Sequence, residues 1–307
     1  MARPVRDDGG GGGDGSGAGW FPHLEAVRGA LTTLYRRLSG DGVARFAASV
    51  RPEVVEFPGD EDPYLGAQRI AGAIVAHLGL PDARMVVSYR DMPYAGRVEL
   101  AAGPEYFVEL HSRFREDRRD VGAALAHEVT HVYLHRLGLR GPEVWEDEIL
   151  TDTVAAYLGV GWLLLDAYRH EPAMRGERIT MAAYTLGYLT PQEYGYVLAK
   201  RALALGDDIE PWFTSPYARD AYRTGLELAR RDLRRPPLAA APWTARRRYA
   251  RHRDQGVSGP DRAFDGPAAA RRVTFPCPTC FQRLRVPCGS PLRARCGLCH
   301  TVHACDP

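Results

Sequence analysis

The stretch DVGAALAHEVTHVYLHRLG occupies residues 120–138 and decides the fold. Its apolar content predicts a helix over 120–137, and Gly138 follows as the residue type that commonly ends a helix. His127 and His131 lie four positions apart, so both imidazoles project from one helix face. The two rings can therefore bind one tetrahedral metal ion, and Glu128 beside them can hold a water molecule.

The residues around this motif predict that the helix is largely buried. Alanine, leucine and valine occupy most positions from 121 to 132. Burying two imidazoles and a carboxylate costs free energy unless a metal ion or hydrogen bonds compensate. A ligand set is therefore favoured over the alternative, a surface helix with two unrelated histidines.

A second acidic segment, WEDEILTD at 145–152, offers the third ligand. A catalytic zinc ion usually keeps three protein ligands and one open position. Glu148 and Asp152 share a helix face at i and i+4, while Glu146 and Asp147 are competing candidates. The alternative is a solvated helix start whose carboxylates favour the positive end of the helix dipole.

Together, the two segments resemble the gluzincin group of metallopeptidases, the relatives of thermolysin. The resemblance implies three ligands of a catalytic zinc ion: His127, His131 and Glu148. It further implies that Glu128 is the general base for peptide hydrolysis by a metal-activated water. Asp152 would accept the ring N–H of a liganding histidine. An edge strand that pairs with an extended substrate is expected at 106–110.

Two further features of the site are left open by the spacing. His135 is one turn beyond the motif, but it does not fit the metzincin pattern, whose third ligand would fall at Leu137. We interpret it as a helix-face residue. Four residues are candidates for an oxyanion donor, and the spacing selects none of them: Tyr157, Tyr184, Tyr188 and His170. For each candidate tyrosine, the alternative is a buried core tyrosine.

The periodicity of the rest of the chain predicts an α+β fold. We expect a mainly helical, zincin-like metallopeptidase domain with a small antiparallel sheet before the motif helix. Expected strands are 84–89, 97–100 and 106–110. Expected helices are 24–38, 64–78, 145–168, 178–189, 191–205 and 217–233. Thr190 and Pro191 predict the N-cap and first turn of the helix at 191–205.

Two cysteine pairs near the C-terminus indicate a second zinc site. Fifteen residues separate Cys277-Pro-Thr-Cys280 from Cys296-Gly-Leu-Cys299, the spacing of two metal-binding knuckles. The pattern resembles a zinc ribbon, whose four-thiolate site is closed and structural. Two disulfides are the alternative, and Cys288 and Cys305 are left over.

Composition shifts divide the chain into four parts. Residues 1–19 form a Gly-rich tail expected to be disordered, and 20–233 form the metallopeptidase domain. An Arg- and Pro-rich linker follows at 234–272, and the ribbon occupies 273–307.

Charge and hydropathy say little about partners. The 40 basic and 38 acidic residues give a net charge of +2, which by itself indicates neither nucleic acid nor a membrane. No apolar run is long enough to cross a bilayer, and no secretory signal precedes position 20. We therefore expect a cytoplasmic protein that acts on a peptide or protein. Its oligomeric state stays open.

Three functional hypotheses follow. The leading one is a zinc-dependent peptidase with one catalytic and one structural zinc ion. A second is a catalytically silent metallopeptidase-like module that recruits nucleic acid or protein through the ribbon and the basic linker. A third is a regulatory protease specific for one partner protein.

Overall fold

The computed structural model describes residues 20–175, 178–232, 263–267, 271–276, 283–289, 291–295 and 302–305. These residues form an α+β protein in which helices predominate, as predicted. The predicted tail at 1–19 and the linker segment 234–262 lie outside the described residues.

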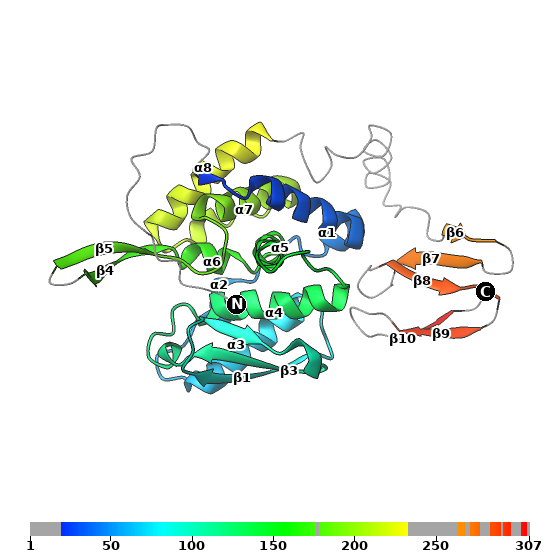
Figure 1. Ribbon diagram of the computed structural model, residues 1–307, viewed down its shortest axis with the longest axis horizontal. Coiled ribbons are helices and arrows are strands. Elements are labelled where there is room, and N and C mark those ends of the chain that lie inside the picture. The colour runs from blue at the N-terminus through cyan, green and yellow to red at the C-terminus, as the bar shows by residue number, and fades with distance from the viewer. Residues whose placement is uncertain are drawn as a thin grey trace.

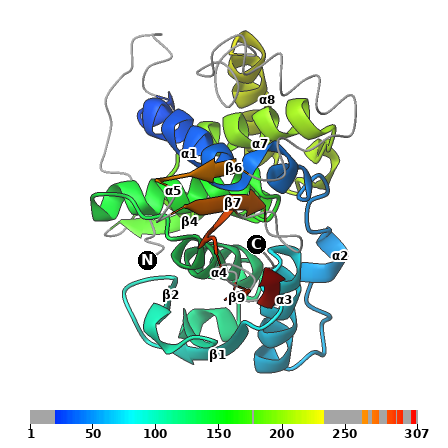
Figure 2. The same cartoon turned by 90° about the vertical axis from the view of Figure 1, so that its right-hand side faces the viewer.

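The motif helix, α4 (Val121–Leu137), lies at the centre of the helical body (Figures 1 and 2). The helix α5 (Val144–Tyr157) packs on one side of it. On the other side lie α3 (Pro63–His77) and a small sheet. Every residue of α4 is buried except His131 and His135, and the helix ends on the left-handed Gly138. The predicted buried helix and its glycine stop are confirmed.

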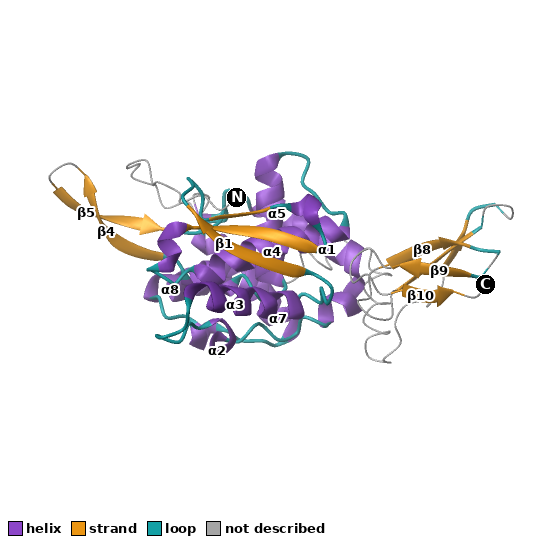
Figure 3. Ribbon diagram, turned by 90° about the horizontal axis from the view of Figure 1, so that it is seen from below, coloured by secondary structure: helices purple, strands orange, loops and turns teal. Residues whose placement is uncertain are grey.

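The sheet contains β1 (Arg84–Arg90), β2 (Gly96–Val98) and β3 (Glu105–His111) in the order β1-β3-β2. The prediction of an antiparallel sheet is correct for β2 and β3 but wrong for β1 and β3, which are parallel. The cause is the position of β3, which returns antiparallel to β2 and enters the sheet between β2 and β1. Alternate residues of β1 and β3 face α3 and α4, while the other face is turned outward (Figure 3).

The prediction that 106–110 is an edge strand is therefore wrong as well. This segment belongs to β3, whose two sides are occupied by β1 and β2. The short strand β2 is the edge that lies against α4.

The helix predicted at 145–168 is two helices. After α5 the chain turns at Gly159, which has a left-handed φ of 88°, and α6 (Trp162–Asp166) follows. A Cβ on Gly159 would lie 2.9 Å from the guanidinium of Arg201 and from the Cα of Ser49. The break is thus set by close packing against distant segments, which the helical periodicity did not reveal.

The prediction of a helix at 178–189 is also wrong. The segment forms β5 (Arg178–Tyr184), which pairs antiparallel with β4 (Arg169–Arg175) in a hairpin that projects from the helices (Figures 1 and 3). Ile179 and Thr180 are β-branched, and pairing with β4 decides their conformation.

The far side of α5 is covered by α1 (Leu24–Ala44) and α7 (Pro191–Leu205), and α8 (Pro216–Arg231) packs on α7 (Figure 2). The predicted Thr190 N-cap is confirmed as a capping box with Glu193. Asp232 joins the three helices, because its carboxylate accepts from Arg28 and Tyr196 while its carbonyl accepts from Lys200 Nζ at 2.8 Å. Lys200 is the only lysine of the chain and is buried.

Short helical segments connect these elements. They are α2 (Pro52–Val55) and the 3₁₀ turns η2 (Leu100–Ala102), η3 (Ser112–Arg115) and η4 (Glu210–Trp212). Across the described residues, none of the helices has the length and apolar character needed to cross a membrane.

The C-terminal part contains two small sheets. One pairs β6 (Ala263–Asp265), β7 (Arg272–Pro276) and β8 (Arg283–Pro287), and the other pairs β9 (Leu292–Arg295) with β10 (Val302–Cys305). The first sheet begins at β6, inside the segment predicted as linker.

The packing of α7 on α8 yields the first prediction. A Cβ on Gly225 would lie 2.1 Å from the backbone nitrogen of Tyr196, where no flexible side chain can yield. Gly225→Ala should therefore lower the free energy of unfolding by about 1–3 kcal/mol, measured by urea denaturation.

The matched control is Gly72→Ala on α3, where an added Cβ meets nothing within 4 Å. Gly72 is exposed, and removing a helical glycine should raise stability by about 0.5–1 kcal/mol. Equal stability of the two variants would contradict the packing argument.

Candidate metal centre

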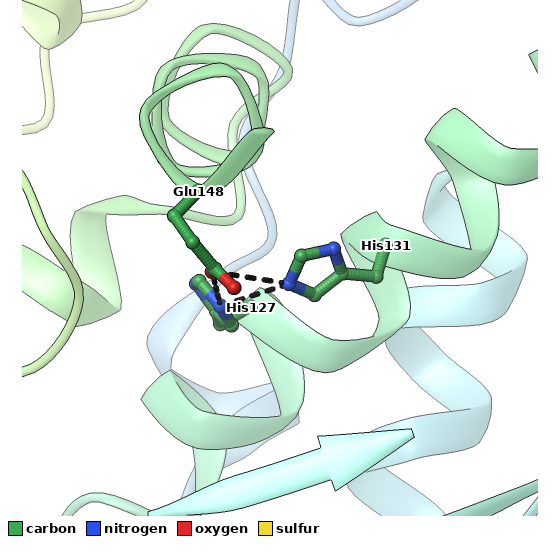
Figure 4. Close-up of side chains that lie close together, drawn as sticks. All are labelled: His127, His131 and Glu148. Atoms are coloured by element: carbon green, nitrogen blue, oxygen red, sulfur yellow. Dashed lines mark hydrogen bonds and ion pairs between the residues drawn. The ribbon is translucent and has the colours of Figure 1, made fainter. Parts of the chain in front are cut away.

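Three ligand-type atoms converge between α4 and α5 (Figure 4). Nε2 of His127 lies 3.0 Å from Oε2 of Glu148 and 3.1 Å from Nε2 of His131. Nε2 of His131 lies 3.3 Å from the same carboxylate oxygen. Of the four acidic residues considered in 145–152, the structure therefore brings Glu148 to both rings.

The orientation of His127 is set by Asp152. Nδ1 of His127 donates to Oδ1 of Asp152 at 2.8 Å, and both side chains are fully buried. This bond keeps a proton on Nδ1, so in the neutral ring the lone pair is on Nε2. That lone pair points to the place where Glu148 and His131 meet.

Asp152 is itself held in place by a turn. Its Oδ2 accepts from the backbone amides of Tyr188 at 2.5 Å and Leu189 at 3.2 Å. The turn requires Gly187, which has φ 86° and where a Cβ would lie 2.7 Å from Oδ2 of Asp152. The turn after β5 thus supports the carboxylate that orients His127.

Without a metal ion, the cluster retains a proton. Burial would lower the pKa of His127, but the charge and hydrogen bond of Asp152 and the hydrogen bond to Glu148 raise it to about 9. Burial would raise the pKa of Glu148, but the hydrogen bond from His127 and the His131 ring beside the carboxylate hold this pKa well below its usual range. Two imidazole nitrogens and one carboxylate oxygen at this separation need a cation between them, either a proton or a metal.

The geometry fits zinc. Tetrahedral bonds of about 2.0–2.2 Å place two ligand atoms roughly 3.3–3.6 Å apart. The three observed separations, 3.0, 3.1 and 3.3 Å, are close to this range. Two nitrogens and one oxygen also form a donor set that zinc accepts while leaving a fourth position open.

Glu128 lies beside the cluster with an unusual environment. The residue is 1% exposed, and its Oε1 has no hydrogen-bond partner among the described residues. A Cβ on Gly96 of β2 would lie 3.0 Å from this oxygen. A glycine at position 96 therefore lets the edge strand approach the carboxylate closely.

A cavity of about 440 Å³ opens onto these groups. Glu128, His131 and Glu148 line it on the side of the cluster. The remaining lining residues come from the sheet, the turn after β2 and the start of α5: Arg97, Val98, Glu99, Leu100, Phe107, Glu109 and Asp147. The cluster is thus accessible to a ligand that lies along β2.

Other residues considered from the sequence lie outside the cluster. Asp147 lines the cavity, but its Oδ1 accepts from the amide of Gly141 at 2.8 Å. His135 is exposed, and neither it nor Glu146 belongs to the group of converging atoms.

The four oxyanion candidates lie in different surroundings. Tyr157 Oη is 2.8 Å from Tyr35 Oη, and Tyr184 Oη accepts from Arg113 at 2.7 Å. His170 stacks on Tyr217. The ring of Tyr188 lies beside the cluster, with 6.4 Å between its centroid and that of His127.

The four cysteines of the predicted ribbon lie outside the described residues: Cys277, Cys280, Cys296 and Cys299. They fall in the segments that link β7 to β8 and β9 to β10. Cys288 and Cys305 are described and are free, half-buried thiols.

Sequence reasoning missed three residues of this site: Gly96, Gly187 and Thr151, whose Oγ1 lies 3.2 Å from Nδ1 of His131. The glycines act through close approach to carboxylates from other elements, for which the local sequence contains no signal. Thr151 shares a helix face with Glu148 at i+3, a spacing that could have indicated it.

Comparison with protein-family models, curated proteins and solved structures found no match.

The cluster predicts that zinc binding releases protons. Because the raised pKa of His127 is about 9, the metal-free protein keeps this proton at neutral pH, and zinc must displace it. Calorimetric titration in buffers of different ionisation enthalpy should assign about one released proton at pH 7 to the zinc ion bound at this cluster. Affinity should rise about tenfold per pH unit and level off above pH 9.

His127→Ala is the control, because it removes this cluster and leaves the predicted four-cysteine site. The number of protons released at this cluster is the number released by the wild type minus the number released by His127→Ala. A difference near zero at neutral pH would contradict the charge state inferred for His127.

Proposed function

We propose that this protein is a zinc-dependent peptidase with a zincin-like catalytic domain. The observation that carries the proposal is the convergence of His127 Nε2, His131 Nε2 and Glu148 Oε2 beside the buried carboxylate of Glu128. The order of elements, with a small sheet before α4 and a second helix that contributes Glu148, supports the gluzincin resemblance.

The proposed chemistry divides between the metal and the chain. A zinc ion bound by the three side chains would supply a Lewis acid that activates water and polarises a carbonyl. Glu128 would accept a proton from the attacking water and deliver it to the leaving nitrogen. Its Oε1, which no described residue contacts through a hydrogen bond, is available for that transfer.

A peptide is the substrate class that β2 favours. Ala95 O accepts from His111 N, and Glu99 N donates to Phe107 O, so alternate residues of β2 face β3. The backbone groups of Gly96 and Val98 therefore face the open edge, beside the cavity. An extended peptide can add to such an edge through main-chain hydrogen bonds.

The burial of Glu128 argues against a catalytically silent module. Leaving a buried polar atom unsatisfied costs roughly 1–3 kcal/mol, and more for a charged group. A binding module that used only its ribbon and linker would gain nothing to offset this cost. A regulatory protease with one partner uses the same chemistry and differs only in substrate range.

The second zinc ion belongs to the same proposal. We assign it to Cys277, Cys280, Cys296 and Cys299, on the basis of their spacing in the sequence. This site would be structural, and reduced thiols in a metal site agree with the expected cytoplasmic location.

Loss of the general base should abolish cleavage while leaving the metal bound. Glu128→Gln should lower kcat/KM for a fluorogenic peptide by about 10²–10⁴-fold, with unchanged zinc content. Glu146→Gln, an acidic residue of α5 outside the cluster, is the matched control and should retain activity. Equal activity of wild type and Glu128→Gln would show that the cleavage comes from another source.

The zinc content of variants should report the two proposed sites separately. After dialysis, the wild type should contain about two zinc ions per chain, and His127→Ala and Cys277→Ser should each lose one. His135→Ala, one turn from His131 on the same helix, should keep both. Unchanged zinc in His127→Ala would refute the catalytic site.

A further inference from the structure

We infer that Thr151 is the positioning residue for His131, and that it directs Nε2 of this ring to the proposed zinc ion. The inference rests on the proposed metal site and concerns how α5 builds it. Oγ1 of Thr151 lies 3.2 Å from Nδ1 of His131, and Thr151 is completely buried.

The direction of this hydrogen bond follows from a second contact. Oγ1 of Thr151 donates to the carbonyl of Asp147 at 2.8 Å. A hydroxyl has one proton, so the same oxygen can only accept from His131. Nδ1 of His131 must therefore be the protonated nitrogen of the neutral ring, which leaves its lone pair on Nε2.

His131 needs this support more than His127 does. The side chain of His131 is 12% exposed at the cavity, whereas that of His127 is fully buried. A ring beside open space can rotate or adopt the other tautomer unless a hydrogen bond holds it. The bond to Thr151 selects the one orientation in which Nε2 lies 3.1 Å from Nε2 of His127.

One face of α5 then supplies three functions. Glu148, Thr151 and Asp152 lie at i, i+3 and i+4, so they project side by side toward α4. Glu148 contributes the third ligand, and the two consecutive residues 151 and 152 accept the Nδ1–H groups of the two liganding histidines. This arrangement locks both tautomers from a single helix.

A purely structural role is the competing explanation, because helical threonines often bond the carbonyl four residues back. The two explanations differ in their dependence on the hydroxyl as an acceptor. Thr151→Val keeps the shape and removes the acceptor, and Thr151→Ser keeps the acceptor.

The experiment is a Co²⁺ titration of the full metal-free chain, with Co²⁺ as a spectroscopic substitute for zinc. Co²⁺ bound by the ribbon cysteines shows thiolate-to-metal charge-transfer bands. Ligand-field bands that grow without a charge-transfer band therefore report Co²⁺ at the nitrogen and oxygen site. Thr151→Val should weaken Co²⁺ binding at that site by about 10–100-fold, and Thr151→Ser should stay within about threefold of wild type. Binding at the thiolate site should not change.

Thr153→Val is the matched control. Thr153 lies on α5, is completely buried, and its Oγ1 has no hydrogen-bond partner among the described residues. The Thr153→Val variant should bind Co²⁺ with the affinity of the wild type. Wild-type affinity in Thr151→Val, or an equal loss in Thr153→Val, would overturn the inference.

A second measurement covers the case in which Thr151→Val does not fold. In the zinc-loaded wild type, ¹⁵N spectra of the histidine rings should show His131 with a protonated Nδ1 and a metal-bound Nε2. Metal bound at Nδ1 would overturn the inference while leaving the peptidase proposal intact. A wild type that binds Co²⁺ only at thiolates would overturn both.

Discussion

The structure depends on one electrostatic constraint: two imidazole nitrogens and a carboxylate oxygen meet within 3.0 to 3.3 Å between α4 and α5. Such a group of acceptors is unfavourable in a buried position unless a cation lies among them. The fold makes the contact unavoidable, because Asp152 fixes one ring and Glu148 approaches from the same helix face. The packing of α4 against α5 thus also sets the geometry of the candidate metal centre.

The helix α4 serves the core and the site together. His127 and Glu128 are at most 1% exposed, within a helix that the sheet, α3 and α5 cover. Such burial gives the side chains little freedom, which the proposed catalysis would require of its site. The cavity opens beside His131 and Glu128, where Gly96 lets β2 approach the Glu128 carboxylate.

Local signals in the sequence predicted the local parts of the fold. The apolar pattern of α4 with Gly138 and the Thr190 cap of α7 were correct, because neighbouring residues determine them. The position of β3 and the strand conformation of β5 depend on pairing with distant segments, and both predictions failed. For the site, the motif and its resemblance identified the converging residues. The roles of Gly96 and Gly187 arise only where separate elements meet.

The single lysine has a consequence for chemical probing. Lys200 lies under α8, and its ammonium group donates to the carbonyl of Asp232. Acylating reagents specific for lysine side chains can reach it only when the layer of α1, α7 and α8 opens. The rate of its labelling would therefore report the local opening of that layer, at one defined position and without an engineered tag.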